Sequence, residues 1–403
     1  MVGRLSRQLD FEAREALVFT AIRVGLWFAA ALALLWSPLN RADSIPPFRA
    51  YGPLTDLVFG AFAQWDSVWF IHIAEHGYDS EQATAFFPLY PLAVHGLAVI
   101  VRSTLVAGVL VSLASGAVAA AAIAKIARAA LGGRVARDAV LFLGLYPIAY
   151  VFTAVYSDGL FLALAASSFL AALRRRAVLA GILGGLAVAT RLIGLALVPA
   201  LLVFLWPRRR SVRECARLLP VAFLPAALGL YALYLHFHVG DAFAFAHAQG
   251  VYWNRQTPPL GPLGGLWDSL TAGWHGGLEL LRHLPRAQGY PTGFVDRDQW
   301  AAWNVVHLLL LLAAVWLTWV AWRQLGPAFG LYSATSIVIV LTSPADLVPL
   351  VSLPRFLLGD FPLFMALARV TEDRPRARQA LLMVFTALAG VAAVAFSRKV
   401  WVA

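Results

Sequence analysis

Acidic and imidazole side chains gather among aromatic residues between Trp65 and Tyr78, after the first long apolar run of this sequence. Charged groups beside a membrane are costly unless they serve a purpose, so this cluster is a candidate functional site. A carboxylate can take the proton of an attacking hydroxyl, which makes Asp66 the candidate general base. It stands between Trp65 and Trp69, whose rings offer stacking surfaces for sugars. The alternative is an interfacial aspartate flanked by residues of the aromatic belt.

Four further polar residues follow in the same stretch, namely His72, Glu75, His76 and Tyr78. If this stretch is helical, three- and four-residue spacing places His72 and Glu75 on one face with Asp66 or its neighbours. We expect Glu75, His76 and Tyr78 to contact a substrate, with helix capping or an exposed polar face as the alternative. The His-x-x-Glu-His order looks like an inverted zinc-protease motif, but no further ligand cluster is evident in the sequence.

Arginine supplies the complementary chemistry, because its planar fork pairs with two phosphate oxygens at once and stays charged in a low dielectric. Arg191 lies within an apolar stretch, and a buried arginine usually faces an interior cavity or a partner. Arg355 begins a late apolar run. We expect both to bind a phosphate. The alternatives are a salt bridge from Arg191 to Asp158 and snorkelling of Arg355 to lipid headgroups.

Asp158 lies in the string 156–159, Tyr-Ser-Asp-Gly, between two apolar runs. Aspartate at such a position is a good helix cap, and that structural role is one reading. The other reading is that Asp158 faces a cavity and orients a substrate or Arg191. His247 and Arg255 come from a later segment that is rich in Gly, Pro and Trp.

Composition sets the class of protein. Hydrophobic residues make up 61% of the chain and charged residues 13%, whereas about a quarter of a soluble domain is charged. Long apolar runs recur from end to end, which predicts an all-α polytopic membrane protein. The net charge of +11 comes from arginines in short loops, the usual topology signal. Without a soluble basic domain, we expect no nucleic-acid partner.

The apolar runs give a topology when the arginine clusters are placed inside. They lie at about 16–36, 105–124, 139–157, 159–173, 177–190, 192–206, 218–237, 301–322, 325–343, 356–370 and 379–397. The positive-inside rule then predicts about eleven crossings. We expect a single membrane domain over residues 1–403, with no large soluble domain.

Two large segments fall outside in this topology, 37–104 and 239–300. Within the first, 86–101 must contribute no net crossing, so we expect it to be an interfacial or re-entrant helix. Run 177–206 must be two short spans, because Thr190-Arg191 interrupts it in the middle. The long segment 239–300 lacks clear periodicity and could cap the outer face. All the candidate residues then fall on the same outer side.

The termini and the cysteine content add two expectations. Cys215 is the only cysteine, so no intrachain disulfide can form. No cleavable signal peptide is apparent, and we interpret the first apolar run as a retained span.

Four strings of the sequence resemble motifs of the PIG-V-type mannosyltransferases, a membrane family with the GT-C glycosyltransferase fold. They are 65–91, 156–159, 189–194 and 352–356. Eukaryotic members add the second mannose of the GPI anchor. In the third string Leu192 and Ile193 replace a polar pair of the family, so contacts from that pair do not carry over. The richness in Ala, Arg and Leu looks like a bacterial homologue.

The resemblance implies an inverting transferase that moves mannose from polyprenyl-phosphate mannose to an acceptor hydroxyl on the extracytoplasmic side. Asp66, which matches the Trp-Asp motif, would be the base, while Arg191 and Arg355 would hold the departing phosphate. His247 and Arg255 lie in a segment that looks like the outer-loop entry of bacterial members and would touch the acceptor or donor. The acceptor would be a glycolipid or glycan, and membrane lipids surround the protein. The location would be the bacterial plasma membrane, or the endoplasmic reticulum membrane in a eukaryote.

No cofactor or metal is expected, because a lipid monophosphate donor carries its own leaving group. The acidic pattern Asp296-Arg297-Asp298 resembles a metal-binding motif of soluble transferases, but three-residue matches are common by chance. Two alternatives stay open. One is a GT-C transferase for another sugar, such as arabinose or glucose. The other is a lipid or solute transporter, although the paired broken helices typical of transporters are not evident.

Overall fold

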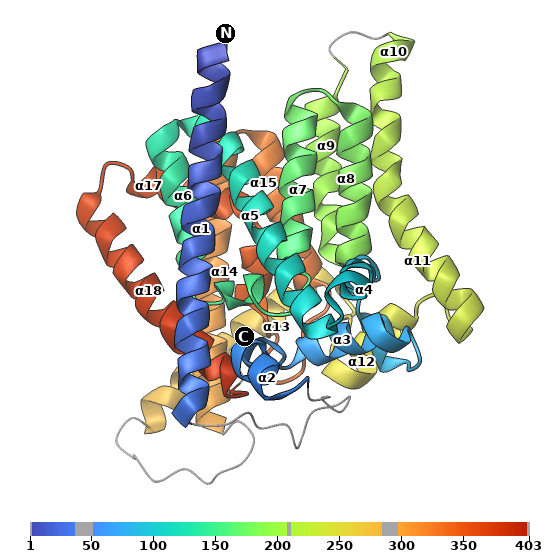
Figure 1. Cartoon of the computed structure of the whole chain (residues 1–403), viewed down its shortest axis with the longest axis vertical. Coiled ribbons are helices and arrows are strands. Elements are labelled where there is room, and N and C mark those ends of the chain that lie inside the picture. Colours follow the sequence, from blue (N-terminus) through green and yellow to red (C-terminus); the bar gives the residue numbers. More distant parts are fainter. Residues whose placement is uncertain (1, 37–50, 208–210, 284–296, 401–403) are drawn as a thin grey trace.

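The computed structural model describes residues 2–36, 51–207, 211–283 and 297–400. Within these ranges the chain consists of α-helices and short 3₁₀-helices, with no strand and one isolated antiparallel bridge between Arg255 and Ala345. Most of the long helices run along the vertical axis of Figure 1. The predicted all-helical membrane class is confirmed.

Five helical stretches among the described residues are long and apolar enough to cross a membrane. They are Asp10–Leu35 within α1 (Val2–Trp36), α5 (Thr104–Leu131), the stretch Val212–Val239 made of α10 (Val212–Cys215), η5 (Ala216–Ala222) and α11 (Phe223–Val239), Gln299–Gln324 within α14 (Arg297–Gln324), and α18 (Pro375–Ser397).

Six further apolar helices are shorter. They are α4 (Leu89–Val101), α7 (Asp158–Leu173), α8 (Ala177–Thr190), the pair η4 (Leu192–Ala196) and α9 (Leu197–Leu205), α15 (Pro327–Leu341) and α17 (Phe361–Thr371). Because these helices are shorter than the roughly 20 residues of a full span, the count of about eleven crossings stays a prediction.

The first outer segment folds into a series of short helices. These are α2 (Pro53–Phe59), η1 (Gly60–Phe62), α3 (Asp66–His76), η2 (Gln82–Ala85) and α4. The axis turns by 119° between Pro53–Phe62 and Asp66–His76. This reversal places α2 and α3 at the lower end of the molecule in Figure 1. Asp66 directly follows the bend as the first residue of α3.

Two predicted spans are broken. Run 139–157 is not one helix: α6 (Gly133–Leu145) ends before Pro147, and the chain continues as η3 (Ala149–Phe152) and loop. The reason is that a proline keeps the residue before it out of the helical region. Run 356–370 is likewise divided between α16 (Leu353–Leu358) and α17, with Asp360 at the junction.

The predicted break in 177–206 is confirmed. Helix α8 ends at Thr190, Arg191 is extended with φ −157°, and η4 starts at Leu192. Gly194 lies in the tight return that follows, because a Cβ there would be 2.7 Å from the backbone N of Val188. A side chain at this position would push the two segments apart.

The segment 239–300, whose sequence lacks clear periodicity, is largely helical in its described part. It contains α12 (Ala244–Trp253) and the long helix α13 (Pro262–His283), which packs along α14. Its role as a cap of the outer face stays a prediction. Glycines interrupt the apolar pattern of α13, and Gly265, Gly273 and Gly276 lie where side chains would collide with α15 or α14. Close helix packing therefore overrides the weak local signal.

Helices α5 and α7 cross closely at the level of the α7 amino terminus. A Cβ on Gly159 would lie 2.8 Å from the carbonyl oxygen of Ser112 and 3.4 Å from the backbone N of Gly116. The small residues Gly108, Ser112 and Gly116 recur at four-residue intervals on α5, so they share one helix face. This face lets α7 begin deep inside the bundle.

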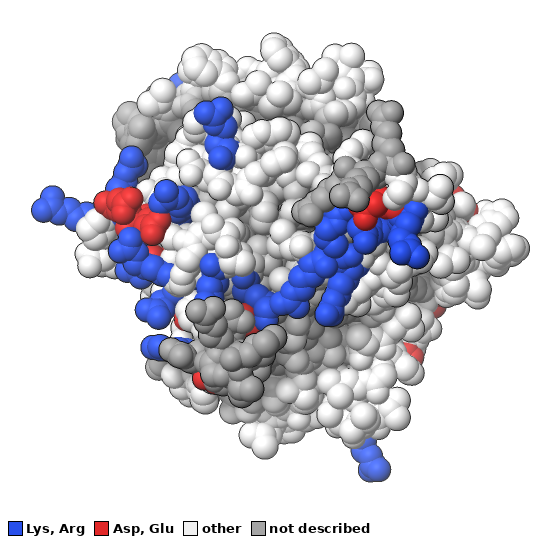
Figure 2. Space-filling view, turned by 90° about the horizontal axis from the view of Figure 1, so that it is seen from above, with Lys and Arg blue, Asp and Glu red and all other residues white. Residues whose placement is uncertain are grey.

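Lysine and arginine side chains gather at the opposite end of the molecule. Figure 2 shows this end from above, with the basic residues interspersed with a few carboxylates. The helix ends here include the α7–α8 turn with Arg174, Arg175 and Arg176, and α10 with Arg213. Arg175 pairs with Glu214 at 3.0 Å. The basic face and α3 thus lie at opposite ends of the helical bundle.

Candidate active site

Asp158 and Arg355 form the centre of the site, although 197 positions separate them in the chain. Asp158 is the first residue of α7, and Arg355 projects from the one-and-a-half-turn helix α16. Arg355 Nε donates to both Asp158 carboxylate oxygens, at 3.2 and 3.0 Å, and Nη2 lies 3.0 Å from Oδ2. Both side chains are largely buried, with 6% and 13% exposed. This two-point contact fixes the plane of the guanidinium.

Asp66 contacts the same guanidinium from another side, through Oδ2 to Nη1 of Arg355. It is the first residue of α3, directly after Trp65, whose φ of 55° is in the left-handed region. A bulky residue in that region is uncommon, and such backbone strain is often found at functional sites. The Asp66 side chain stays 25% exposed, so one face of the carboxylate remains accessible.

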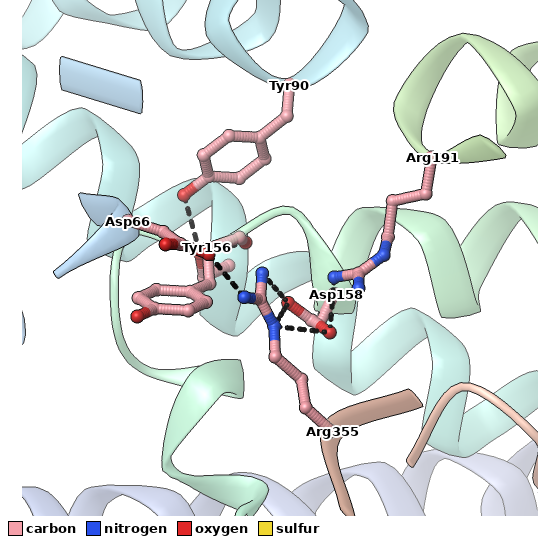
Figure 3. Close-up of polar contacts among 7 residues, drawn as sticks. Asp66, Tyr90, Tyr156, Asp158, Arg191 and Arg355 are labelled. Carbon is pink, nitrogen blue, oxygen red and sulfur yellow. Dashed lines mark hydrogen bonds and ion pairs between the residues drawn. The ribbon is translucent and has the colours of Figure 1, made fainter. Parts of the chain in front are cut away.

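Arg191 completes the cluster. Its Nη1 lies 2.6 Å from Oδ1 of Asp158, and its side chain is 13% exposed. Asp158 is therefore paired with two arginines, as Figure 3 shows. The salt bridge considered for Arg191 from sequence is present. It does not exclude phosphate binding, because a guanidinium has five N–H donors and Asp158 occupies only part of them.

Residues that the sequence analysis did not assign hold this cluster in place. The guanidinium carbon of Arg355 lies 4.3 Å from the centre of the Tyr156 ring. The carbonyl of Tyr156 accepts a hydrogen bond from Ser112 at 3.2 Å, and the Tyr90 hydroxyl contacts the Ser112 hydroxyl at 2.7 Å and donates to Gly108. Tyr90 stood within a motif string, but only the tertiary contacts show what it touches.

A cavity of about 620 Å³ opens beside the cluster. Its charged lining residues among those described are Asp66, Arg191, Arg255 and Arg355, and the other lining side chains are aromatic, aliphatic or neutral polar. Trp65 lines it as well and is 37% exposed. Five predicted site residues from distant parts of the chain therefore share one cavity, and Asp158 lies directly behind them.

Arg255 reaches the cavity from the connection between α12 and α13. Burial lowers the pKa of Arg255 to about 10, while the nearby Asp66 carboxylate opposes this shift. The side chain thus remains charged at neutral pH. Its Nη1 and Nη2 donate to the carbonyls of Ser343 and Val351, at 3.0 and 2.9 Å.

The remaining predicted residues lie away from the cavity lining. Trp69 is 7% exposed and stacks on Phe86 with ring centres 6.0 Å apart. Glu75 accepts a hydrogen bond from Tyr51 at 2.9 Å, and Tyr78 donates to the carbonyl of Phe86 at 2.7 Å.

The two predicted histidines are also outside the cavity lining. The ring of His76 stacks on His72 with centres 4.7 Å apart. His247 lies 2.6 Å from Asp241 on an exposed surface. Hydrogen bonds from the backbone of Phe243 and from His247 hold the pKa of Asp241 below its usual range. Substrate contacts by these residues stay predictions.

Metal ligands do not cluster in the described part of the chain: it contains no group of three or more His, Cys, Asp or Glu side chains placed to hold a metal ion. Of the acidic pattern noted in the sequence, Asp296 lies outside the described residues.

The comparison with protein families gives one match. Residues 18–208, which include Asp66, Asp158 and Arg191, match the family described as "Mannosyltransferase (PIG-V)". Over these residues the chain is similar to the PIG-V family. The predicted resemblance is thereby confirmed for the amino-terminal half, while Arg255 and Arg355 lie beyond the matched range.

Two mammalian relatives show the same similarity. GPI alpha-1,6-mannosyltransferase 2 of Rattus norvegicus is 35% identical to this chain over 92 residues, which cover 21% of the chain and 19% of the relative. The Mus musculus protein is 36% identical over the same length. The match therefore spans about a fifth of the length of these curated relatives.

Solved structures overlap with the chain more broadly but weakly. The oligosaccharyltransferase of Archaeoglobus fulgidus in the apo form superposes on 92% of this chain, and the superposed part is 56% of the oligosaccharyltransferase. The identity is 14% and the TM-score is 0.43. The same enzyme in complex with an inhibitory peptide and a dolichol-phosphate gives the same TM-score and identity. A similarity at this level does not indicate the substrate or the chemistry of this chain.

Proposed function

We propose that this chain is a membrane mannosyltransferase that moves mannose from polyprenyl-phosphate mannose to an acceptor hydroxyl. The meeting of Asp66, Asp158, Arg191 and Arg355 beside one cavity carries the proposal, because it joins a partly exposed carboxylate to buried arginines. The PIG-V match supplies the class of sugar. The GT-C fold and the polyprenyl donor are expectations from that family resemblance.

The charge of the site suits a phosphodiester donor. Three arginines, Arg191, Arg255 and Arg355, face two aspartates, Asp66 and Asp158, among the described residues at the cavity. This leaves one net positive charge. A polyprenyl-phosphate sugar carries one negative charge, so its binding would neutralise the site. A diphosphate donor would add more negative charge than the site can balance.

These positions support the following reaction. The acceptor oxygen attacks the anomeric carbon from the face opposite the phosphate, so the configuration inverts. Asp66 takes the hydroxyl proton as the new carbon–oxygen bond forms. The bond between the anomeric carbon and the phosphate oxygen breaks, and its electron pair stays on the phosphate. Arg191 and Arg355 stabilise the charge that develops there.

Arg355 Nη1 contacts Oδ2 of Asp66. A phosphate bound to Arg355 would compete with Asp66 for the same guanidinium, so donor binding would weaken the hold of Arg355 on the carboxylate. The basic face and α3 lie at opposite ends of the helical bundle. Because basic residues are retained on the cytoplasmic side of a membrane, this arrangement supports an active site on the extracytoplasmic side.

The test uses the purified chain in nanodiscs with radiolabelled polyprenyl-phosphate mannose and a membrane glycan extract. We expect Asp66→Asn, which keeps the shape and removes the charge, to lower transfer by about 10²- to 10⁴-fold while donor binding persists. The matched control is Asp79→Asn, since Asp79 is half-exposed in the same outer segment and pairs with His72.

Three outcomes would change the proposal. Equal transfer by the native chain and Asp66→Asn would remove Asp66 from the base role. A product that carries another sugar would assign a different donor. The native chain could also show neither transfer nor donor binding and instead move a lipid or solute across a vesicle membrane. That result would replace the proposed transferase with a transporter.

A further inference from the structure

Arg255 ties the outer helices to the segment that leads into α16. Its backbone N–H donates to the carbonyl of Gln249 on α12, at 3.1 Å. Arg255 also forms the isolated antiparallel bridge with Ala345, and the neighbouring Gln256 donates to Pro344 at 3.0 Å. The connection between α12 and α13 is thus hydrogen-bonded to the connection between α15 and α16.

The side chain of Arg255 holds both ends of that second connection. Nη1 donates to the carbonyl of Ser343, just after α15, and Nη2 donates to the carbonyl of Val351, just before α16. The guanidinium carbon also lies 5.6 Å from the centre of the Phe356 ring, and Arg191 contacts the same ring at the same distance. Phe356 is adjacent in sequence to Arg355.

The turn that Arg255 holds is the one from which Arg355 emerges. Ser352 follows Val351 and has φ 65°, a left-handed conformation that a residue with a side chain rarely adopts. Its carbonyl accepts the backbone N–H groups of Arg355 and Phe356, at 3.0 and 3.1 Å. A conformation of this kind persists only where the surroundings enforce it, and Arg255 supplies two of the enforcing contacts.

We propose that Arg255 is a positioning residue that aims Arg355 at Asp66 and at the donor phosphate. This inference rests on the proposed function, because Arg355 is taken to be a phosphate ligand. The alternative is that Arg255 binds the phosphate directly. The two carbonyl contacts commit one N–H of each terminal nitrogen to the connection between α15 and α16, which is the contact that positioning requires. The binding measurements below separate this role from direct binding.

A double-mutant cycle separates positioning from direct binding. Binding of radiolabelled undecaprenyl phosphate to the chain in nanodiscs would be measured for Arg255→Ala, Arg355→Ala and the double variant. We expect Arg255→Ala to weaken binding on the order of tenfold, and the double variant to bind no more weakly than Arg355→Ala alone, because both changes remove the same interaction. Losses that add in the double variant would overturn the proposal.

A second measurement needs no ligand. Hydrogen exchange of the backbone amides of Arg355 and Phe356 should accelerate in Arg255→Ala, since the turn that orders them loses two contacts. Arg255→Lys should resemble Arg255→Ala, because a single ammonium lacks the fork that spans two carbonyls. The control is Arg282→Ala on α13, where the side chain is 71% exposed and lies 3.9 Å from Glu279.

The exchange measurement tests the positioning role of Arg255, and the binding measurement tests the proposed donor, so each can give a negative result without the other. Unchanged exchange at Arg355 and Phe356 in Arg255→Ala would overturn the positioning role whatever the substrate is. Faster exchange without any undecaprenyl phosphate binding by the native chain would keep the structural role of Arg255 and count against the proposed donor.

Discussion

Asp158 is the residue on which the charges of the site converge. It pairs with Arg191 and Arg355 and is 5% exposed, so it is a shared counter-ion of two cations that water reaches poorly. A buried carboxylate shared by two arginines costs desolvation free energy that the pairing must offset. The arrangement keeps both guanidinium groups oriented while leaving further N–H donors for a ligand.

Asp158→Asn should therefore destabilise the protein as well as weaken donor binding. Breaking a buried ion pair by removing one partner costs about 3–5 kcal/mol, because the other charge is left uncompensated. Thermal unfolding in detergent would measure the loss, with the half-exposed Asp79→Asn expected to stay within about 0.5 kcal/mol of the native chain. A melting temperature equal to the native value would show that Asp158 is not needed as a counter-ion.

At the scale of the elements, the crossing of α5 and α7 decides where Asp158 lies. Helix α7 begins at Asp158, and the next residue, Gly159, packs against the backbone of α5 at Ser112. The same Ser112 contacts Tyr90 on α4 and the carbonyl of Tyr156. One close helix contact thus sets the depth of both Asp158 and the Tyr156 ring under Arg355.

Gly159→Ala tests this crossing. Its Cβ would lie 2.8 Å from the Ser112 carbonyl oxygen, so the helices must separate. We expect a loss of about 1–3 kcal/mol in unfolding free energy and weaker donor binding, because Asp158 moves with α7.

Gly229→Ala on α11 is the matched control, since no atom lies within 4 Å of its added Cβ. At an open helical position the change should be neutral or stabilise by about 0.4–1 kcal/mol. Equal effects of the two substitutions on unfolding would contradict the role assigned to the crossing.

At the scale of the whole molecule, the charge distribution orients the protein. Basic side chains gather at one end, and α3 lies at the other end with α2 and α12. The positive-inside rule predicts that the basic end lies in the cytoplasm. Cys215 is exposed and lies on α10 at the basic end, so this chain carries a natural reporter of orientation.

Labelling of intact cells with a membrane-impermeant maleimide should leave Cys215 unmodified until the cells are permeabilised. Ser80→Cys, placed in a Cys215→Ser background, should be modified without permeabilisation, because Ser80 is exposed in the outer segment after α3. The reverse pattern would place the active site in the cytoplasm and rule out an extracytoplasmic reaction.

The local chemistry of the sequence was enough to predict several features. Long apolar runs made the helical membrane class evident, because each run has a direct energetic preference for lipid. The break at Arg191 was also predictable, since a charge between two apolar stretches resists burial in a continuous span. Asp66, Asp158, Arg191 and Arg355 stood out for the same reason.

Other features depended on contacts that no local pattern reports. The α13 helix was not predicted, because helix packing at its glycines outweighed the weak local signal. The contacts of Tyr90, Ser112 and Phe356 at the site were missed because they join distant segments. The break in run 139–157 is different, since Pro147 is a local signal that hydropathy alone does not register.

By itself, the sequence determined the membrane class, the broken span and the residue types available for catalysis, because these follow from apolar runs and from the cost of charge in lipid. Only the tertiary structure decided which charges meet. Arg355 reaches Asp66 across 289 positions and Asp158 across 197. Such pairing depends on the close α5–α7 crossing and on the turn held by Arg255, and the geometry of both is set by packing among distant segments.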